Sequence, residues 1–482
     1  NSFKRDLTDF FIPWNAEKSP NPQLLLYNSA LSSELGLKMK EVDQTITEKL
    51  FSGNMLPNGA EPIVQVYAGH QFGGFSPQLG DGRALLLGEI IDPHGLRWDM
   101  QLKGSGPTPF ARDGDGKAPL DAVLREYLIS EAMHAMRIPT TRALAAIKTG
   151  EVIFRRTKIP GAILTRIASS HLRVGTFQFF AARGADQIVK KLLDYTIKRH
   201  YPYALESPVP ALAFFDSVTR AQSILVSKWM SIGFIHGVMN TDNTTISGET
   251  IDYGPCAFMD EYNPHTVFSS IDTHGRYSYS NQLPILVWNL ARLAETLVPH
   301  INEKHETAIN ILTERINVFS AEVKEMWIQL MIKKIGLEAN TQENVELVTS
   351  LLSVMEKGKA DFTLTFHYLS DALEGNTDPI GSLFENPRSI YDWKKKWKNH
   401  IDNGNASKES CLKAMNSINP IYIPRNHMVE EALKSATEND DMSKFNKLLK
   451  VVTSPFKQIK EFENYKLPNP NKNETYQTFC GT

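Results

Sequence analysis

The sequence predicts an α+β fold with a strand-rich N-terminal part and a larger helical C-terminal part. Three observations support this prediction. Short apolar runs accompany many glycines between residues 62 and 116, as in strands joined by tight turns. Apolar residues recur at helical spacing in several later segments. The two kinds of element are grouped rather than regularly alternating, which argues against a doubly wound parallel sheet.

Composition restricts the class of protein. The chain has 482 residues, 41% of them hydrophobic and 22% charged, which is typical of globular proteins. At about 100–200 residues per domain, this length predicts two to four structural units. Lysine and arginine number 52 and aspartate and glutamate 54, which gives a net charge of -2. This net charge gives no support to a nucleic-acid partner.

The sequence also bears on location. No apolar run reaches the roughly 18 residues of a membrane span, and Asn1–Phe11 lacks the pattern of a signal peptide. We expect no membrane partner and a cytoplasmic location, although the absent initiator methionine leaves open a targeting peptide removed earlier. Cys256, Cys411 and Cys480 are too few for a disulfide framework or a cysteine-rich zinc site. A reducing compartment with at most one disulfide follows.

The strand-rich part begins after a mixed lead-in of about 60 residues. The runs Ala84–Ile91 and Leu96–Leu102 predict two strands joined by a turn at Pro93–Gly95. Pro119 suits the first turn of a helix, and apolar residues then recur at helical spacing as far as Ala132. Further strands are predicted near Ala143–Lys148, Glu151–Arg156 and Ala162–Ile167.

The chain becomes helical after Gly184. Helices are predicted over Ile188–Tyr201 and Ser217–Ile235, followed by a polar loop at His236–Asn243. Two short apolar segments then lead to a turn at residues 251–254. Nearly everything from Pro284 to about Ser454 is predicted to be helical, and the tail from residue 468 to be loop-like. Breaks between these helices are expected at Gly375–Pro379, Asp402–Ser407 and Asn419–Pro424.

Several common catalytic motifs are missing. There is no G-x-x-x-x-G-K-[ST] phosphate loop, no H-E-x-x-H, no paired C-x-x-C and no G-x-S-x-G. The sequence therefore gives no support to a Walker-type nucleotide site, a zinc hydrolase or an α/β-hydrolase nucleophile. The 13 histidines are scattered, and a single one among them is expected to be structural or exposed.

The first candidate site is the run Gly80-Asp81-Gly82-Arg83, which precedes a predicted strand. Glycines at Gly80 and Gly82 let the backbone approach a ligand closely, and Arg83 could meet a phosphate oxygen. The alternative is a tight turn that only feeds the strand.

The second candidate is a lysine and glutamate pair. Lys103 ends a predicted strand, and Glu126 lies 23 residues later on the predicted helix. Kinase-like sites use such a pair to hold the lysine against nucleotide phosphates. The alternative is two unrelated surface charges, because both residue types are common.

The third candidate is the polar loop and the turn that follows it. His236 is followed seven residues later by Asn243, and Asp252 stands in a D-x-G turn. Kinase-like phosphotransferases have this order, in which the asparagine and the aspartate bind metal. Their oxygens suit Mg²⁺. The order of all the pieces predicts a protein-kinase-like fold with two lobes, and the alternative is a plain polar loop between a helix and a hairpin.

One position departs from the kinase pattern. A kinase loop has an aspartate two residues after the histidine, whereas this chain has Val238, which cannot accept a proton. The nearby carboxylate is Asp242, beside Asn243. We therefore expect altered catalysis or a catalytically inactive fold rather than an ordinary protein kinase.

The chain resembles the selenoprotein O family, a kinase-like family of protein adenylyltransferases (AMPylators). The resemblance is dense over roughly residues 60–300. The matching stretches are Tyr67–Glu89, Gln101–Leu120, Arg125–Leu144, His236–Ile246 and Ile251–Asp260, and the terminal Cys480-Gly481-Thr482 fits as well. Some members have selenocysteine near this end, where this chain has cysteine.

The resemblance implies that ATP binds inverted relative to a kinase, so that AMP passes to Ser, Thr or Tyr of a target protein and pyrophosphate leaves. It implies a divalent metal, Mg²⁺ or Mn²⁺, on Asn243 and Asp252, and Asp242 as general base. It also implies that Arg166 and Arg173 bind the β- and γ-phosphates. The other implied nucleotide contacts are Gly80, Gly82, Arg83, Lys103 supported by Glu126, Asp115, Gly116 and Asp252.

The implied division of the chain has five parts. They are a lead-in over 1–60, a nucleotide-binding lobe over 61–185, a helical catalytic lobe over 186–300, a helical extension over 301–467 and a tail over 468–482. The tail carries Cys480, and the family's link to redox control favours a disulfide between Cys480 and Cys256, which follows Asp252 by four residues. Three free thiols are the alternative.

Two other functions stay open. The chain could be a phosphotransferase in which Asp242 replaces the lost base, or a pseudokinase that holds nucleotide and scaffolds a partner. A dead site does not need five intact residues, so the second is disfavoured by the simultaneous presence of Lys103, Glu126, Asp242, Asn243 and Asp252.

Overall fold

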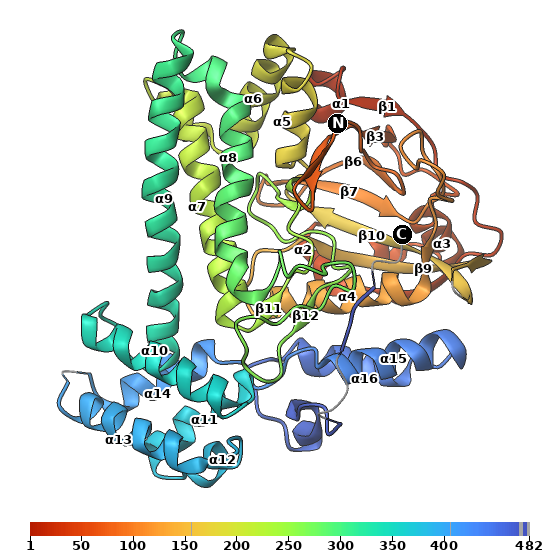
Figure 1. Ribbon diagram of the computed structural model, residues 1–482. Helices are drawn as coiled ribbons and strands as arrows, with labels where there is room; N and C mark the ends of the chain where they lie inside the picture. The colour runs from red at the N-terminus through yellow and green to blue at the C-terminus, as the bar shows by residue number, and fades with distance from the viewer. Residues whose placement is uncertain (156, 405, 472–475, 480–482) are drawn as a thin grey trace.

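The computed structural model describes residues 1–155, 157–404, 406–471 and 476–479. Its main β-sheet lies within the first 168 residues, and helices make up most of the rest (Figure 1). The predicted α+β class is therefore confirmed.

The main sheet is antiparallel and is formed by strands that lie far apart in the sequence. Its order is β1-β3-β6-β7-β10-β9-β2, and β8 pairs with β10. The strands are β1 Phe11–Pro13, β2 Gln23–Tyr27, β3 Ile63–Gln65, β6 Ala84–Ile91, β7 Arg97–Lys103, β8 Ala118–Pro119, β9 Arg142–Phe154 and β10 Lys158–Ala168. A separate hairpin consists of β4 Gly69–Gln71 and β5 Gly74–Ser76.

The lead-in contributes to this sheet. Strand β1 pairs with β3, and β2 pairs with β9 at the opposite edge. The same segment supplies the helices α1 Ser2–Asp6, α2 Ser29–Glu34 and α3 Gln44–Phe51 and the 3-10 turn η1 Met39–Glu41. The first 60 residues are therefore packed with the strands that follow them.

The hairpin of β6 and β7 follows its local sequence. The predicted strands are confirmed, with β7 beginning and ending one residue later than expected. Asp92 fixes the turn because its Oδ1 accepts hydrogen bonds from the backbone nitrogens of His94 and Leu96, both at 2.9 Å. Gly95 adopts φ +82°, which favours glycine.

The predicted break between Ala143–Lys148 and Glu151–Arg156 is wrong. Strand β9 runs continuously through Gly150 to Phe154, and Arg156 lies outside the described residues. Gly150 has φ +83°, and an added Cβ would lie 2.7 Å from the Cβ of Asn21. The glycine therefore admits a neighbouring segment rather than ending the strand. Strand β10 pairs with β9 along its length and includes the predicted segment Ala162–Ile167.

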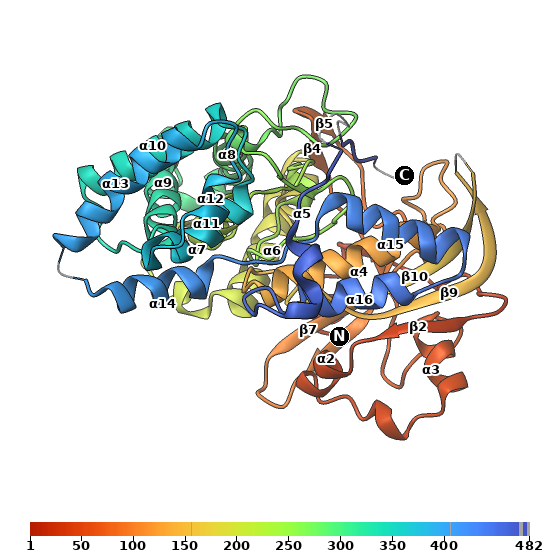
Figure 2. The ribbon, with the colours of Figure 1, turned by 90° about the horizontal axis from the view of Figure 1, so that it is seen from below.

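Helix α4, Leu120–Ala135, confirms the helix predicted after Pro119. It lies between the sheet and the helices α15 Asn426–Glu438 and α16 Ser443–Val452 (Figure 2). Because it is covered on both sides, its polar residues Arg125, Glu126 and Glu131 are buried together with its apolar ones.

Both predicted ends of Ser217–Ile235 are wrong. Helix α7 is Pro210–Ser231, because proline is well suited to the first turn. Gly233, at φ +72°, follows its end, and Phe234–Ile235 form strand β11, which pairs with β12 Ala257–Phe258. The predicted helix over Ile188–Tyr201 is confirmed as α6 Asp186–His200, whereas α5 Val174–Ala181 was not expected.

Most of the rest of the chain is helical. Of the predicted breaks, Asn419–Pro424 lies between two helices and Asp402–Ser407 begins at the last residue of one, whereas Gly375–Pro379 overlaps a short helix at its end. The helices are α8 Gln282–Ile301, α9 His305–Lys334, α10 Gln342–Lys357, α11 Phe362–Glu374, α12 Asp378–Gly381, α13 Pro387–Asp402 and α14 Lys408–Ile418. Short 3-10 turns are η2 Pro202–Glu206, η3 Thr241–Asn243, η4 Tyr279–Asn281 and η5 Lys460–Lys466.

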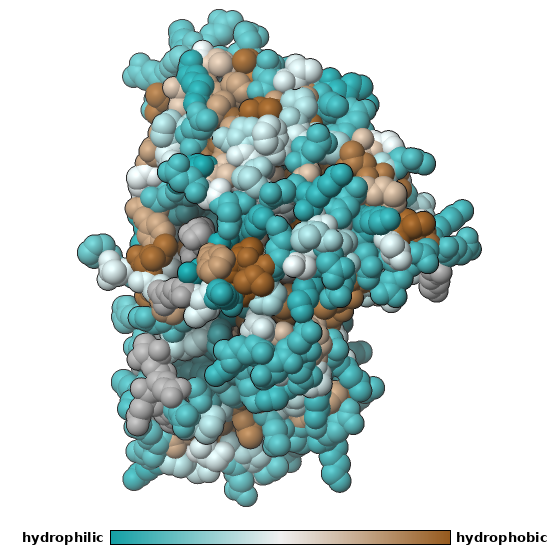
Figure 3. All heavy atoms as spheres, turned by 90° about the vertical axis from the view of Figure 1, so that its right-hand side faces the viewer, coloured by the Kyte–Doolittle hydropathy of each residue, from teal (hydrophilic) through white to brown (hydrophobic). Residues whose placement is uncertain are grey.

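The sheet separates two apolar cores. Neighbouring residues of β10 face opposite sides, so that Ile163 belongs to one core and Leu164 to the other. The smaller core includes residues of α2 and α3, and the larger one includes α4 and continues into the helices. Among the described residues, no helix is long and apolar enough to cross a membrane. On the face shown in Figure 3, hydrophobic residues form small separate groups.

The described part of the tail docks on the body. Thr478 forms an isolated parallel bridge with Ser269. Its Oγ1 also donates a 2.7 Å hydrogen bond to the carbonyl oxygen of Pro255. Tyr476 donates to Glu430 of α15 at 2.6 Å.

Candidate functional site

Lys103 and Glu126 form an ion pair. Lys103 ends β7, Glu126 lies in the middle of α4, and the Lys103 Nζ to Glu126 Oε2 distance is 2.6 Å. Their side chains are 12% and 7% exposed. Packing of α4 on the sheet thus brings together two residues 23 positions apart, as the sequence predicted.

Arg166 joins this pair from the neighbouring strand β10. Its Nη1 lies 3.2 Å from Glu126 Oε1 and 2.7 Å from Asp252 Oδ1, and its Nη2 donates to Gln101 Oε1 at 2.6 Å. Burial disfavours the charged guanidinium, but the carboxylates of Asp252 and Glu126 outweigh burial and raise the pKa of Arg166. Arg166 is therefore a fixed cation.

Asp252 lies at the centre of the charge cluster. Its Oδ1 also accepts a hydrogen bond from Lys103, and its Oδ2 lies 4.0 Å from Arg173 Nη1. Burial would raise the pKa of Asp252, but Lys103, Arg166 and Arg173 hold it well below the usual range. Its φ of +62° is uncommon for a residue other than glycine and is typical of functional positions.

The polar loop between β11 and β12 is held by the surrounding helices and turns. The ring nitrogen Nε2 of His236 lies 2.9 Å from the carbonyl oxygen of Ile251, which ties the start of the loop to the turn containing Asp252. Gln282 of α8 accepts a hydrogen bond from the backbone nitrogen of His236 at 3.1 Å. Asn243 donates from Nδ2 to the carbonyl oxygen of Val238 at 3.0 Å, which fixes its amide group.

Asp242 is almost completely covered. Burial raises its pKa to about 6, against the attraction of Arg173. Gln71, in the hairpin β4–β5, donates to Asp242 Oδ2 at 3.4 Å, whereas the buried Oδ1 has no hydrogen-bond partner among the described residues. Gly69 approaches this oxygen so closely that an added Cβ would lie 2.5 Å from it. The hairpin therefore covers the proposed base.

Arg173 lies between the loop and the hairpin. Its guanidinium carbon is 4.2 Å from the centre of the Tyr67 ring, and its Nη1 donates to the carbonyl oxygen of Asp242 at 3.0 Å. Its Nη2 is buried and has no hydrogen-bond partner among the described residues. A buried guanidinium nitrogen with an unused donor suits an anionic ligand oxygen.

The glycine-rich loop lies against the loop that follows Lys103. An added Cβ at Gly80, where φ is +125°, would lie 2.5 Å from the Phe110 ring. At Gly82 the added Cβ would lie 2.9 Å from the Phe110 carbonyl oxygen. The carbonyl oxygen of Arg83 accepts a hydrogen bond from Gly104, the residue after Lys103, at 2.7 Å. The glycines thus let this loop lie directly beside the end of β7.

The two residues Asp115 and Gly116 differ in their surroundings. Gly116 is buried and so close to Gly106 that an added Cβ would overlap its backbone, which places it beside the loop after Lys103. Asp115 is exposed and forms an ion pair with Arg155 at 2.8 Å. No described contact joins Asp115 to the Lys103 cluster.

Of the two cysteines predicted to pair, the structure describes only Cys256. Cys256 is buried, and burial raises the pKa of its thiol to about 12. Cys480 lies outside the described residues. The pairing of Cys256 with Cys480 therefore stays a prediction, although Thr478 contacts Pro255, the residue before Cys256.

The Asp252 and Asn243 oxygens fit a divalent cation. No described residue donates a hydrogen bond to Asp252 Oδ2 or to Asn243 Oδ1. The described part of the chain has no group of three or more His, Cys, Asp and Glu that could hold a metal. A cation here would therefore need further oxygens, and Mg²⁺ commonly takes them from phosphates and water.

Reasoning from spacing alone missed the hairpin β4–β5, the ring of Tyr67 and the buried pair of Asp81 and Gln101. Asp81 Oδ2 accepts from Gln101 Nε2 at 3.2 Å, and Gln101 in turn accepts from Arg166. Burial raises the pKa of Asp81 to about 6. The density of glycines around residues 69–82 was the one signal in the sequence that this region approaches a ligand or another backbone closely.

Comparison with known proteins gives a consistent family. Residues 1–453 match the family described as protein adenylyltransferase SelO. The chain is 52% identical over 463 residues to the protein nucleotidyltransferase YdiU of Bacillus cereus (strain B4264), covering 96% of this chain and 93% of that protein. It is 49% identical over 484 residues to the protein of the same name from Rhizobium meliloti (strain 1021), covering 100% and 99%.

Proposed function

The chain belongs to the SelO family, and from this membership we propose that it is a protein adenylyltransferase. It transfers AMP from ATP to Ser, Thr or Tyr hydroxyls of target proteins and releases pyrophosphate. The observation that carries the proposal is the set of three cations, Lys103, Arg166 and Arg173, around Asp252, close to the covered carboxylate of Asp242. This set suits a triphosphate beside a base.

The proposal includes a protein-kinase-like fold with two lobes. Its support is the order and position of the parts: a lysine on a strand of the sheet, a glutamate on the helix packed against that sheet, and a loop and turn between the later helices. The division into parts at residues 60, 185, 300 and 467 belongs to the same proposal.

Asn243 and Asp252 would hold a divalent metal, Mg²⁺ or Mn²⁺, through amide and carboxylate oxygens. When bound, this ion supplies positive charge that offsets the charge on the phosphate oxygens. Lys103, held by Glu126, would bind a phosphate oxygen, and Arg166 and Arg173 would bind the β- and γ-phosphates. Their charges stabilise the pyrophosphate as it leaves.

The glycine-rich loops would hold the nucleotide from the sheet side. Gly80, Gly82 and Gly116 leave room for close backbone approach, and Arg83 and Asp115 would add polar contacts. Asp115 would reach the nucleotide only after leaving Arg155, because the two form an ion pair in this structure.

Asp242 would act as the general base. The acceptor hydroxyl oxygen attacks the α-phosphorus, its proton passes to a carboxylate oxygen of Asp242, and the bond from the α-phosphorus to the pyrophosphate oxygen breaks. Gln71 would orient the carboxylate through its contact with Oδ2.

The test is the origin of the transferred group. The purified chain is incubated with a cell lysate, Mg²⁺ and ATP labelled either at the α- or at the γ-phosphate. Protein-bound label from α-labelled ATP alone, with a mass increase of one AMP, supports the proposal. Asp252→Ala should abolish that transfer. Label from γ-labelled ATP alone would indicate a phosphotransferase, and nucleotide binding without either label would indicate a pseudokinase.

A further inference from the structure

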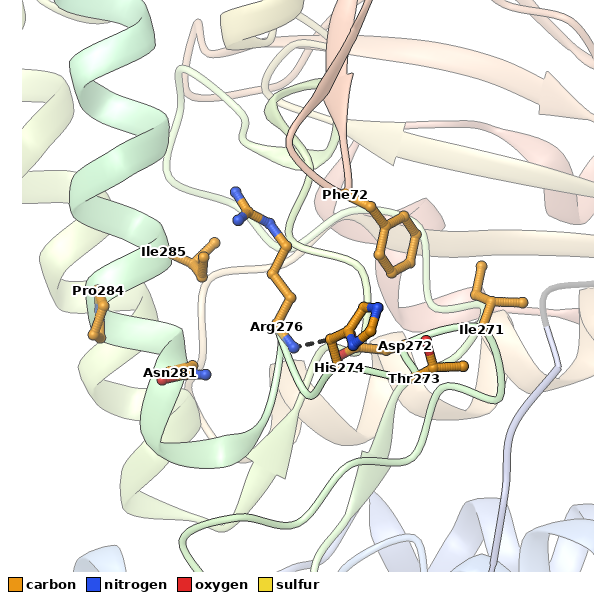
Figure 4. Close-up of a pocket in the computed structure, with 9 residues that line it drawn as sticks. All are labelled: Phe72, Ile271, Asp272, Thr273, His274, Arg276, Asn281, Pro284 and Ile285. Carbon is orange, nitrogen blue, oxygen red and sulfur yellow. Dashed lines mark hydrogen bonds between the residues drawn. The ribbon is translucent and has the colours of Figure 1, made fainter.

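A surface hollow of about 540 Å³ lies next to the hairpin β4–β5 (Figure 4). Phe72 lines it from the hairpin tip, and Ile271–His274 and Arg276 line it from the long loop between β12 and α8. Asn281 at the end of η4 and Pro284 and Ile285 at the start of α8 complete the lining. Neither the loop of Asp242 nor the cluster of Asp252 lines this hollow.

Two neighbouring residues of the hairpin connect the hollow to the proposed base, Asp242. Gln71 contacts the Asp242 carboxylate, and the next residue, Phe72, lines the hollow. The backbone nitrogen of Phe72 donates to Asn240 Oδ1 at 3.1 Å and to the Tyr277 hydroxyl at 3.2 Å. One residue of extended chain spans about 3.3–3.6 Å. A protein segment whose hydroxyl lies at Asp242 can therefore reach the hollow within a few residues.

The walls of the hollow are preformed. Asp272 is buried, and its two carboxylate oxygens accept from the backbone nitrogens of Arg276 at 2.9 Å and Tyr277 at 2.8 Å. The Tyr277 hydroxyl donates to Asn240 Oδ1 at 2.6 Å. Phe72 has φ +52°, a costly conformation that its hydrogen bonds maintain. Asp272 thus closes the loop on itself, and Tyr277 ties it to Asn240.

The charged residues that line the hollow are the cation Arg276 and the carboxylate Asp272. Arg276 lies between Phe72 and α8 in Figure 4, with its guanidinium carbon 4.8 Å from the centre of the Trp288 ring. The described residues form no ion pair with Arg276, and its buried Nε has no hydrogen-bond partner among them. Each carboxylate oxygen of Asp272 accepts a hydrogen bond from the backbone, and neither is paired with the Arg276 guanidinium. An incoming carboxylate would therefore pair with Arg276 without a competitor.

The hollow also has apolar walls. Phe72, Pro284 and Ile285 line it, and Ile271 at its edge is 56% exposed. A fixed arginine beside exposed apolar side chains is the composition of a site that recognises a peptide segment.

We propose that this hollow binds the acceptor protein, through a segment that carries an aspartate or glutamate and an apolar residue within a few positions of the modified hydroxyl. This inference rests on the proposed adenylyl transfer and adds to it the chemistry of the acceptor. Arg276 pairs with the acidic side chain, and Phe72 and Ile271 contact the apolar one.

The probes are three synthetic peptides with a central serine. They differ at one nearby position, which is occupied by glutamate, glutamine or lysine. Two measurements are made with the full chain: binding of fluorescent peptide by anisotropy, and transfer of label from α-labelled ATP. The glutamate peptide should bind about tenfold more tightly than the glutamine peptide and be modified with a correspondingly higher kcat/KM. This difference should shrink at high salt, because the pair is partly exposed.

The variants are Arg276→Glu, Ile271→Ser and the control Arg220→Glu, which changes an exposed arginine of α7. Arg276→Glu should reverse the preference in favour of the lysine peptide. Ile271→Ser, a change at a 56% exposed side chain, should weaken the binding of all three peptides about equally. The control should behave as the wild type. A thermal unfolding curve of each variant identifies any that does not fold.

The outcomes separate the two proposals. If the wild type transfers label but all three peptides bind and react alike, the acceptor hollow is wrong and the adenylyl transfer stands. If no label is transferred yet the glutamate peptide binds in an Arg276-dependent way, the hollow stands and the proposed activity fails. Displacement of the peptide by pyrophosphate or polyuridylate, with the same dependence on Arg276, would indicate a general anion site and overturn the inference.

Discussion

Asp242 and Asp252 are ten residues apart, and their surroundings shift the pKa values of their carboxyl groups in opposite directions. Three cations surround Asp252 and keep its pKa well below the usual range. Asp242 is covered by the hairpin β4–β5, and burial raises its pKa to about 6. A permanently ionised carboxylate suits a metal ligand, and one with a raised pKa suits proton transfer. The two proposed roles therefore follow from the surroundings of each side chain.

Asp242→Asn should lower turnover by about 10²–10⁴-fold, because an amide cannot accept the proton of the acceptor hydroxyl. Its affinity for ATP should stay within a few-fold of the wild-type value, measured by calorimetry with Mg²⁺. Asp216→Asn, a change in the partly exposed part of α7, is the matched control. Loss of ATP binding together with turnover would make Asp242 part of the metal site instead.

Arg173→Lys should impair use of ATP, although the charge is kept. Lysine lacks the planar group that packs on Tyr67 and the second donor that the buried Nη2 offers. We expect kcat/KM for ATP to fall at least tenfold, with a smaller loss for Arg220→Lys at the exposed position on α7. Unchanged kinetics for Arg173→Lys would mean that this side chain does not contact the phosphates.

Whole elements set the positions of these residues. Strands β7 and β10 are neighbours, so that Arg166 pairs with Gln101 across the sheet and lies beside Lys103. Helix α4 brings Glu126 from the opposite side, and the hairpin β4–β5 brings Gln71. The site therefore depends on how these elements pack against one another.

An element-scale prediction concerns the end of helix α9. Lys334 is 2% exposed, and its ammonium nitrogen lies 4.4 Å from the centre of the Phe366 ring in α11. Burial lowers the pKa of this lysine to about 7. The unfolded chain, with a pKa near 10.4, thus binds more protons between these two values. Stability should rise with pH from about 7 to about 10, by up to about 1.4 kcal/mol per unit.

Lys334→Met should remove this dependence, because it replaces the titrating group with an apolar chain of similar length. Urea unfolding at pH 7.0 and 9.5 should show a more stable variant at pH 7.0 and a smaller difference between the two pH values. Lys333→Met, at the exposed neighbouring position, should leave the dependence unchanged. An equal slope in Lys334→Met and the wild type would contradict the lowered pKa.

At the scale of the whole molecule, the two ends of the chain pack against different parts of the fold. The lead-in adds β1 and β2 to opposite edges of the sheet. The tail passes α15 and docks at Ser269 and Pro255, directly after the turn that contains Asp252. A covalent bond at this point would fix the tail beside the site.

We predict that Cys256 and Cys480 form a disulfide when oxidised glutathione accepts the two electrons, and that activity changes with it. Both protons leave as the sulfur–sulfur bond forms. Activity should differ with and without dithiothreitol in the wild type but not in Cys480→Ser, with Cys411→Ser as the control for a buried cysteine elsewhere. Absence of a Cys256–Cys480 peptide from an oxidised digest, with equal activity in every condition, would exclude the pair.

The sequence by itself determined the α+β class, the hairpin of β6 and β7, helix α4 and the breaks between the later helices. These features depend on local signals: apolar periodicity, glycine at turns and the residue types at helix ends. The order of Lys103, Glu126, Asn243 and Asp252 also indicated the pairing that the structure contains for the first two. The remaining roles rest on resemblance and stay proposals.

Only the tertiary structure decided where the lead-in lies, that β9 continues through Gly150 and that Phe234–Ile235 leave the helix for a strand. It also decided that Arg166 and Arg173 meet Asp252 and that the hairpin covers Asp242. All of these depend on contacts between residues far apart in the chain. Local sequence patterns do not predict the free energy of such contacts. Local preference sets which elements can form, and long-range burial and charge pairing decide which of them do and what they bring together.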